Sequence, residues 1–85
     1  MQVKRLPRFD GSYCRLSAPI QKKVQKTILL LTSNLKHPSL RVKKMQGIDA
    51  YEARVDIHYR LTFGMVADVL ELYTVGMHDT GLGKK

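Results

Sequence analysis

The sequence predicts an α+β fold with an N-terminal strand and with two helices packed on one face of an antiparallel sheet of about four strands. Three observations support this prediction. Residues 51–63 have apolar side chains at every odd position and polar side chains at every even one, which is typical of strands with one dry face. Residues 17–37 have apolar positions at the helical period. Residues 69–75 are apolar at most positions, as expected for a central strand covered on one face.

The first elements are expected to be short. Residues 2–8 predict an edge strand, because Val3 lies among basic residues and Pro7 is tolerated only where its missing N–H would face solvent. Asp10 and Ser12 then offer N-cap oxygens for a short helix.

The second helix has clear signals at both ends. Ser17 is the expected N-cap, Pro19 lies in the first turn, and the pair His37-Pro38 ends the helix. One apolar stripe should face the sheet; its members are Ile20, Val24, Ile28, Leu31 and Leu35. Leu29 projects from the opposite side, where it either contacts the preceding short helix or anchors a binding partner.

The strands follow in the C-terminal half. Residues 40–45 alternate imperfectly and predict a strand that ends at Gly47. The alternating segment 51–63 is long for one strand, so we expect it to reverse at residues 56–58, which places Arg54 opposite Arg60. A second reversal is expected at residues 64–68. Because like charges directly opposite each other destabilise a strand pair, the two arginines indicate a face that meets an anion.

Length and charge restrict the functions. Eighty-five residues are expected to form one domain, residues 1–85. A formal charge of +8 and a pI near 9.9 indicate a polyanionic partner, either nucleic acid or an acidic protein. The longest aliphatic run, residues 28–31, is too short to span a membrane, so we expect a cytoplasmic protein.

Cysteine and histidine usage gives no sign of a metal or cofactor. Cys14 is the only cysteine, which rules out an internal disulfide and fits a reducing compartment; we expect it to be a small buried side chain. The cysteine and histidines lack the spacing of a zinc site, and we therefore expect no metal and no cofactor.

Several short motifs together resemble the RelE/ParE superfamily of bacterial toxins. They are H-P-S-L at 37–40, K-K-M-x-G at 43–47, Y-E-A-R-V at 51–55, H-Y-R-L-T-F at 58–63 and V-G-M-H-D at 75–79. The resemblance covers nearly the whole chain and implies a RelE-like fold and the toxin of a type II toxin–antitoxin pair. One branch of the superfamily enters the ribosomal A site and cuts mRNA; another inhibits DNA gyrase.

For the RNA-cutting branch, the resemblance implies metal-independent chemistry. The 2′-hydroxyl of one nucleotide attacks its own 3′-phosphate and a cyclic phosphate forms. This reaction needs a base, cations near the phosphate and an acid for the leaving oxygen. The resemblance also implies an acidic antitoxin, bound in a toxin–antitoxin hetero-oligomer. Two alternatives remain: a gyrase inhibitor, or a catalytically inactive homologue that only binds antitoxin.

The resemblance assigns roles to three residues of the alternating segment. Arg60 matches a phosphate-binding arginine. Arg54 occupies a position usually held by lysine, and because guanidinium stays protonated it favours charge stabilisation over proton transfer. Glu52 is either the base or a counter-ion that neutralises Arg54.

His78 matches a position occupied by arginine or histidine in the family's nucleases, where an imidazole would protonate the leaving oxygen. By strand parity it shares a face with Leu70 and Leu72, so the chain would have to bend at Gly76 to bring it to the arginines.

Further residues are candidates for RNA contact. Arg41, Lys43 and Lys44 form a basic patch that either holds RNA phosphates or is only a solvated strand edge. Many nucleases of the family have a tyrosine beyond the position of His78, which this chain lacks. Tyr73 is the expected substitute for stacking on a base.

Overall fold

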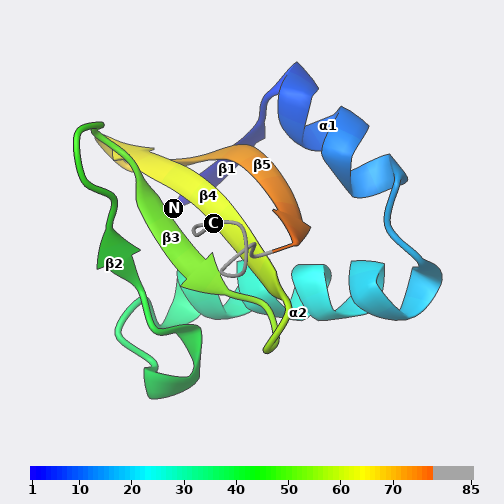
Figure 1. The fold of residues 1–85 in the computed structure, drawn as a ribbon. Coiled ribbons are helices and arrows are strands. Elements are labelled where there is room, and N and C mark those ends of the chain that lie inside the picture. The colour runs from blue at the N-terminus through cyan, green and yellow to red at the C-terminus, as the bar shows by residue number, and fades with distance from the viewer. Residues whose placement is uncertain (78–85) are drawn as a thin grey trace.

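The computed structural model describes residues 1–77, which form a five-stranded sheet with helices on one side. The elements are β1 (Gln2–Arg5), α1 (Pro7–Cys14), α2 (Ala18–Ser33), the short 3-10 helix η1 (Pro38–Leu40), β2 (Lys43–Lys44), β3 (Tyr51–Arg54), β4 (Tyr59–Val66) and β5 (Val69–Met77). The strand order is β1-β5-β4-β3-β2, and α2 crosses behind the sheet in Figure 1.

The predicted α+β class is confirmed, with one difference in the sheet. The sheet has five strands rather than about four, and it is mixed, because β1 pairs in parallel with β5 whereas the other neighbours are antiparallel. β4 occupies only one edge of β5. The N-terminal strand β1 covers part of the other edge and runs parallel to β5.

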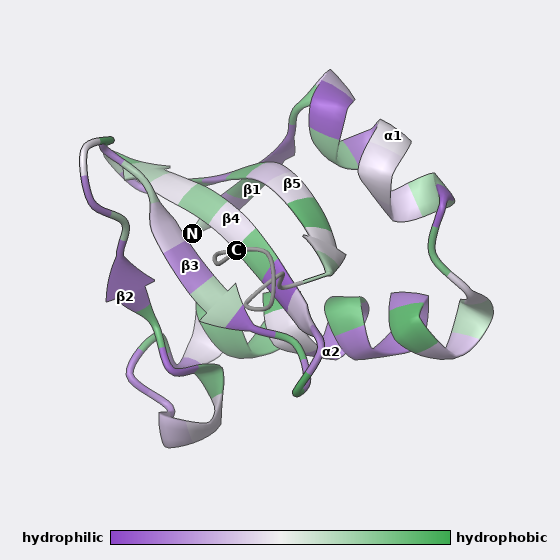
Figure 2. Cartoon of the chain, in the orientation of Figure 1, coloured by the Kyte–Doolittle hydropathy of each residue, from purple (hydrophilic) through white to green (hydrophobic). Residues whose placement is uncertain are grey.

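The core lies between the sheet and the helices, as the alternating pattern predicts. Ala53, Leu61 and Phe63 of the odd-numbered series are buried. They pack with Phe9, Val24, Leu31, Leu40, Leu70, Leu72 and Val75. Figure 2 shows the corresponding alternation of green and purple along the strands. Removing such a side chain from water stabilises the fold by roughly 1.5–3 kcal/mol.

The helix α1 begins before Asp10 and Ser12, the residues expected to cap it. The strand predicted over residues 2–8 ends at Arg5, and Pro7 begins the helix, where its fixed φ angle is favourable. Ser12 is therefore inside the helix. Its Oγ donates to the Phe9 carbonyl (3.0 Å) and accepts from the Val75 N–H (3.1 Å), which satisfies a donor of β5 beyond the end of its pairing with β1.

The helix α2 begins as predicted but ends early. Ser17 is its N-cap residue and Pro19 lies in the first turn. The helix stops at Ser33 instead of continuing to His37-Pro38. In its last turn the hydroxyl groups of Thr32 and Ser33 both donate to the Leu29 carbonyl, and such bonds compete with helical continuation.

Two strand boundaries also differ from prediction. The strand expected over residues 40–45 contains only Lys43 and Lys44, because Leu40 is buried within η1 and Arg41 adopts a left-handed conformation (φ 47°) that interrupts an extended chain. The reversal expected at 64–68 is tighter. β4 continues through Val66, and Ala67, with φ 54°, makes the turn into β5.

Two surface residues correct the expectations for the helices. Cys14 is exposed at the end of α1, so the prediction of a buried side chain was wrong. Leu29 is 69% exposed, which disfavours the first of its two expected roles, contact with the preceding short helix. Within residues 1–77 the helices are too short or too polar to cross a bilayer.

Candidate functional site

The candidate site lies on the sheet face opposite the core. The even-numbered polar residues of β3 and β4 point to this side, and the strands are not covered by either helix in Figure 1. Arg54 pairs directly with Arg60, as the reversal at residues 56–58 predicts. On its other side Arg60 faces Gly76 of β5. The neighbour without a side chain leaves space beside the guanidinium.

The guanidinium of Arg60 is held by backbone and acid groups. Its Nη1 donates to the carbonyl oxygens of Asp56 (2.7 Å) and Tyr59 (3.0 Å), and its Nε lies 3.9 Å from Oε1 of Glu52. Only 21% of the side chain is exposed. Arg60 is therefore oriented before any ligand binds.

Glu52 lies between two cations. Its Oε1 is 3.9 Å from both Arg60 Nε and Lys43 Nζ, and 15% of its side chain is exposed. Glu52, one of whose expected roles was to neutralise Arg54, thus pairs with Lys43 and Arg60 instead. The register explains this, since Glu52 is directly opposite Lys43 on β2 and diagonal to Arg60 on β4.

Two hollows in the open face share Glu52 and Arg60 as lining residues. One, of about 220 Å³, lies over β4 and β5 and is lined by Glu52, Arg60, Thr62, Thr74, Val75, Gly76 and Met77. The other, of about 420 Å³, lies toward β2 and is lined by Arg41, Val42, Lys43, Glu52 and Arg60. The face therefore offers a basic groove rather than a deep cavity, which suits an extended anionic chain.

The predicted basic patch is divided by the register of β2. Arg41 and Lys43 line the larger hollow with Arg60. Lys44 instead pairs with Tyr51, whose ring stacks on Phe63 at 5.7 Å between centroids. By alternation Lys44 belongs to the opposite side of this two-residue strand. The three cations do not form one surface on the open face.

A bulge places Tyr73 on the open face. Thr62 pairs with Thr74 and Phe63 with Leu72, so that Tyr73 is the extra residue of β5. A Cβ at Gly64 would overlap its phenol, which shows that the ring lies over this glycine. Burial and the neighbouring Glu71, 3.4 Å from the hydroxyl, raise the pKa of Tyr73.

The same bulge corrects the parity argument for the end of β5. Leu70 and Leu72 share the core face with Val75, because the extra residue reverses the alternation between them. The open face consequently includes Gly76. His78 itself lies outside the described residues.

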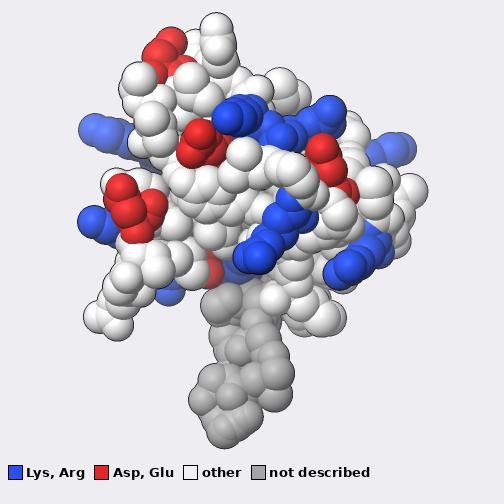
Figure 3. Space-filling view, turned by 90° about the horizontal axis from the view of Figure 1, so that it is seen from above, with Lys and Arg blue, Asp and Glu red and all other residues white. Residues whose placement is uncertain are grey.

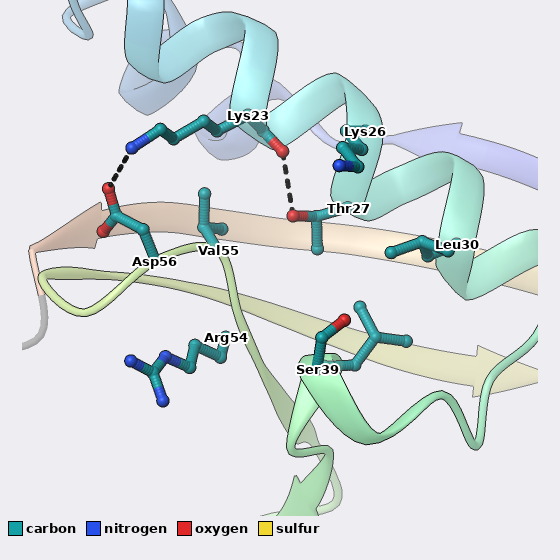
Figure 4. A pocket seen from close by; sticks show the side chains of 9 residues that line it. Lys23, Lys26, Thr27, Leu30, Ser39, Arg54, Val55 and Asp56 are labelled. Carbon is teal, nitrogen blue, oxygen red and sulfur yellow. Dashed lines mark hydrogen bonds and ion pairs between the residues drawn. The ribbon is translucent and has the colours of Figure 1, made fainter.

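On the opposite side of the hairpin, a cleft of about 270 Å³ separates α2 from the end of β3. In Figure 4 Thr27 and Val55 point into this space, whereas the guanidinium of Arg54 extends away from α2. Lys23 reaches from α2 to Asp56, with 3.2 Å between Nζ and Oδ2. The cleft lacks Arg60 and Glu52, but Arg54 is one of its lining residues, so it adjoins the arginine pair.

Asp56 is a residue that the sequence analysis missed. Burial alone would raise its pKa; hydrogen bonds from the His58 N–H, Lys23 and the Tyr59 N–H outweigh that effect and lower the pKa below its usual value of 3.8. Aspartate is a typical first residue of a three-residue loop between strands. This preference is the sequence signal that could have identified Asp56.

The net charge alone does not locate the site. Figure 3 shows lysine and arginine side chains scattered among acidic ones over the face seen from above, without one continuous basic surface there. What distinguishes the open face is the opposed arginine pair and its neighbouring hollows.

Comparisons with known proteins identify the fold. No protein-family model matches the chain, and no curated protein sequence is significantly similar to it. The YoeB/ParE toxin from Agrobacterium tumefaciens superposes with a TM-score of 0.78 at 14% identity, over 92% of this chain and 99% of the toxin. YafQ from E. coli strain BL21(DE3) gives a TM-score of 0.78 at 16% identity, over 91% and 92% of the two chains.

A third similar structure is a complex. The archaeal RelE–RelB complex from Pyrococcus horikoshii OT3 contains a chain that superposes with a TM-score of 0.78 at 16% identity, over 94% of this protein and 97% of that chain. The protein therefore has the fold of the RelE, YoeB and YafQ toxins, as its motifs predict.

Proposed function

We propose that this protein is a toxin of a type II toxin–antitoxin system that acts in the cytoplasm as a ribosome-dependent mRNA endonuclease. The observation that supports the proposal best is the arginine pair on the uncovered sheet face of a fold shared with RelE, YoeB and YafQ toxins. A pair of opposed cations beside a basic groove is suited to an RNA phosphate.

The proposed reaction is attack by a 2′-hydroxyl on the adjacent 3′-phosphate. The 2′-hydroxyl gives its proton to a base, either Glu52 or a water molecule. The new O2′–P bond gives a cyclic phosphate, the bond from phosphorus to the 5′-oxygen breaks, and the leaving oxygen takes a proton. Arg60 binds the phosphate, and Arg54 stabilises the charge that develops on it. We assign the leaving-group acid to His78. No step requires a metal.

Glu52 has two roles to choose between. As the base, its carboxylate would take the 2′-hydroxyl proton. Its position between Lys43 and Arg60 favours the other role, a counter-ion that leaves Arg60 when phosphate arrives. Arg41 and Lys43 would then contact RNA beyond the cleaved bond. The ring of Tyr73, which lies on the open face, could stack on a base.

The proposed partner is an acidic antitoxin. The chain's +8 charge is complementary to an acidic partner, and the similar RelE chain was solved as a complex with RelB. Leu29, on the outer side of α2, is our candidate for an apolar contact with this partner.

Growth arrest and mRNA cleavage on translating ribosomes test the proposal. Expression of the wild-type chain should stop growth and yield cleaved mRNA. Arg60→Ala and His78→Ala should each lower the cleavage rate by about 10²-fold or more and relieve the growth arrest, while both variants remain folded. Full toxicity in both variants would exclude the assigned site.

A binding function is the second candidate, favoured by an arginine at position 54 that cannot act as a base and by the ion-paired Glu52. In this case the chain would inhibit DNA gyrase or only bind antitoxin. Inhibition of supercoiling by purified gyrase without mRNA cleavage would identify the gyrase function. Tight antitoxin binding without growth arrest would identify the inactive homologue.

A further inference from the structure

The turn between β3 and β4 is built around one carboxylate. Oδ1 of Asp56 accepts hydrogen bonds from the N–H groups of His58 (2.8 Å) and Tyr59 (2.9 Å). These bonds fix the three-residue loop from within, because an aspartate side chain here replaces the backbone acceptor of a tight turn. The geometry of the loop consequently depends on this side chain.

The other carboxylate oxygen ties the loop to the helix layer. Lys23 Nζ lies 3.2 Å from Oδ2 of Asp56, as the dashed line in Figure 4 shows. The aspartate side chain is 17% exposed, whereas that of Lys23 is 54% exposed. The two oxygens thus have separate tasks, one within the turn and one toward α2.

The backbone of the same residue holds the arginine of the candidate site. The carbonyl oxygen of Asp56 accepts from Arg60 Nη1 at 2.7 Å, and the Tyr59 carbonyl accepts from the same nitrogen at 3.0 Å. Both Nη1 hydrogens are used in this way, and Nε faces Glu52. Within residues 1–77, Nη2 donates no hydrogen bond.

We propose that Asp56 is a positioning residue for the anion site: its carboxylate closes the β3–β4 turn and its carbonyl oxygen orients the Arg60 guanidinium toward phosphate, with Lys23 of α2 as the outer support. The proposal deepens the proposed function and rests on Arg60 as the phosphate-binding group. Asp56 touches neither substrate nor reacting atoms. Its effect on binding is exerted through Arg60, since a frayed loop would release both Nη1 contacts together.

Side-chain NMR of the full-length protein tests the orientation without any RNA. In the wild type the Arg60 Nη1 and Nη2 protons should give separate signals, because hydrogen bonds slow rotation of the guanidinium. Asp56→Ala should merge these signals and weaken binding of inorganic phosphate about three- to tenfold. Asp56→Asn should keep both properties within about twofold, because the amide oxygen still accepts the two N–H bonds.

Two further variants separate the tasks of the carboxylate. Asp56→Glu retains the charge near Lys23 but has a longer side chain that does not form the turn, so it should resemble Asp56→Ala; it also replaces that variant if Asp56→Ala fails to fold. Lys23→Met should weaken phosphate binding about twofold. Lys22→Met removes the same charge from a neighbouring position of α2 and should leave the Arg60 signals unchanged.

The outcomes distinguish this inference from the proposed function. A folded Asp56→Ala or Asp56→Glu protein with separate Arg60 signals and wild-type phosphate affinity would overturn the positioning role. Equal losses in Asp56→Asn and Asp56→Ala would also overturn it, because charge rather than the turn would then matter. If wild-type protein binds no phosphate while Arg60 responds to the substitutions as expected, the positioning role stands and the anion site fails.

Discussion

The two faces of this sheet use the same strands for different purposes. On the helix side Leu61 is fully buried, and its nearest neighbours are apolar. On the open side the adjacent residue, Arg60, lies opposite Arg54 and contacts carbonyl groups and Glu52. The contrast teaches that stability and the proposed anion binding depend on alternate residues of one strand, and substitutions should therefore separate them.

The two arginines also differ from each other. Arg60 is anchored through Nη1 and Nε, whereas Arg54 forms no ion pair within residues 1–77. A held cation and a free one facing each other suit a phosphate that is bound by the first and further stabilised by the second.

The largest expected effect is on the buried face. Leu61→Ala should lower the free energy of unfolding by about 2–4 kcal/mol, because it leaves a cavity in a packed core. Thr62→Ala, one residue along on the open face, should change it by no more than about 0.5 kcal/mol. Urea denaturation of both variants measures the difference. Similar losses at the two positions would show that the faces are not energetically distinct.

A smaller effect is expected from filling the hollow beside Arg60. A Cβ added at Gly76 meets no atom of residues 1–77 within 4 Å, so Gly76→Val should fold normally. Its branched side chain would occupy the space next to the guanidinium and weaken binding of a single-stranded RNA oligonucleotide about tenfold. Gly11→Ala, where added volume is equally unopposed but lies on α1, is the matched control. Wild-type affinity in the Gly76 variant would place the RNA elsewhere.

The smallest effect concerns the counter-ion of the open face. Glu52→Gln should raise affinity for the same oligonucleotide about threefold and steepen the dependence of log K on log salt by about 0.7, because one competing negative charge is removed. Glu71→Gln removes a carboxylate near Tyr73 instead and serves as the control. Unchanged affinity and salt slope would exclude the counter-ion role. Loss of mRNA cleavage despite tighter binding would assign Glu52 as the base.

Much of the fold was predictable because strand alternation is a local property. The period of residues 51–63 gave the buried face and the reversal, and hence the pairing of Arg54 with Arg60. The limits of α2 and β2 were less predictable. The hydroxyl bonds of Thr32 and Ser33 and the left-handed turn at Arg41 depend on how the chain packs after the helix ends.

The candidate site was predictable in part for the same reason. Residues of one hairpin face could be identified by counting, but the partners of Glu52 could not, since they come from the register of β2. Alternation alone could not assign the later residues of β5 to a sheet face, because the extra residue at the Tyr73 bulge changes the face of every later position. Asp56 was overlooked because its contacts join a turn, a helix and an arginine from three places in the sequence.

The sequence by itself determined the α+β class, the dry and wet faces of the hairpin and the opposed arginines, because each follows from periodicity within a few residues. Only the tertiary structure decided that β1 runs parallel beside β5, that Glu52 lies between Lys43 and Arg60, and that Asp56 contacts both Lys23 of α2 and Arg60. These arrangements depend on contacts between distant segments. Such contacts form when the core packs, and no local sequence pattern predicts them.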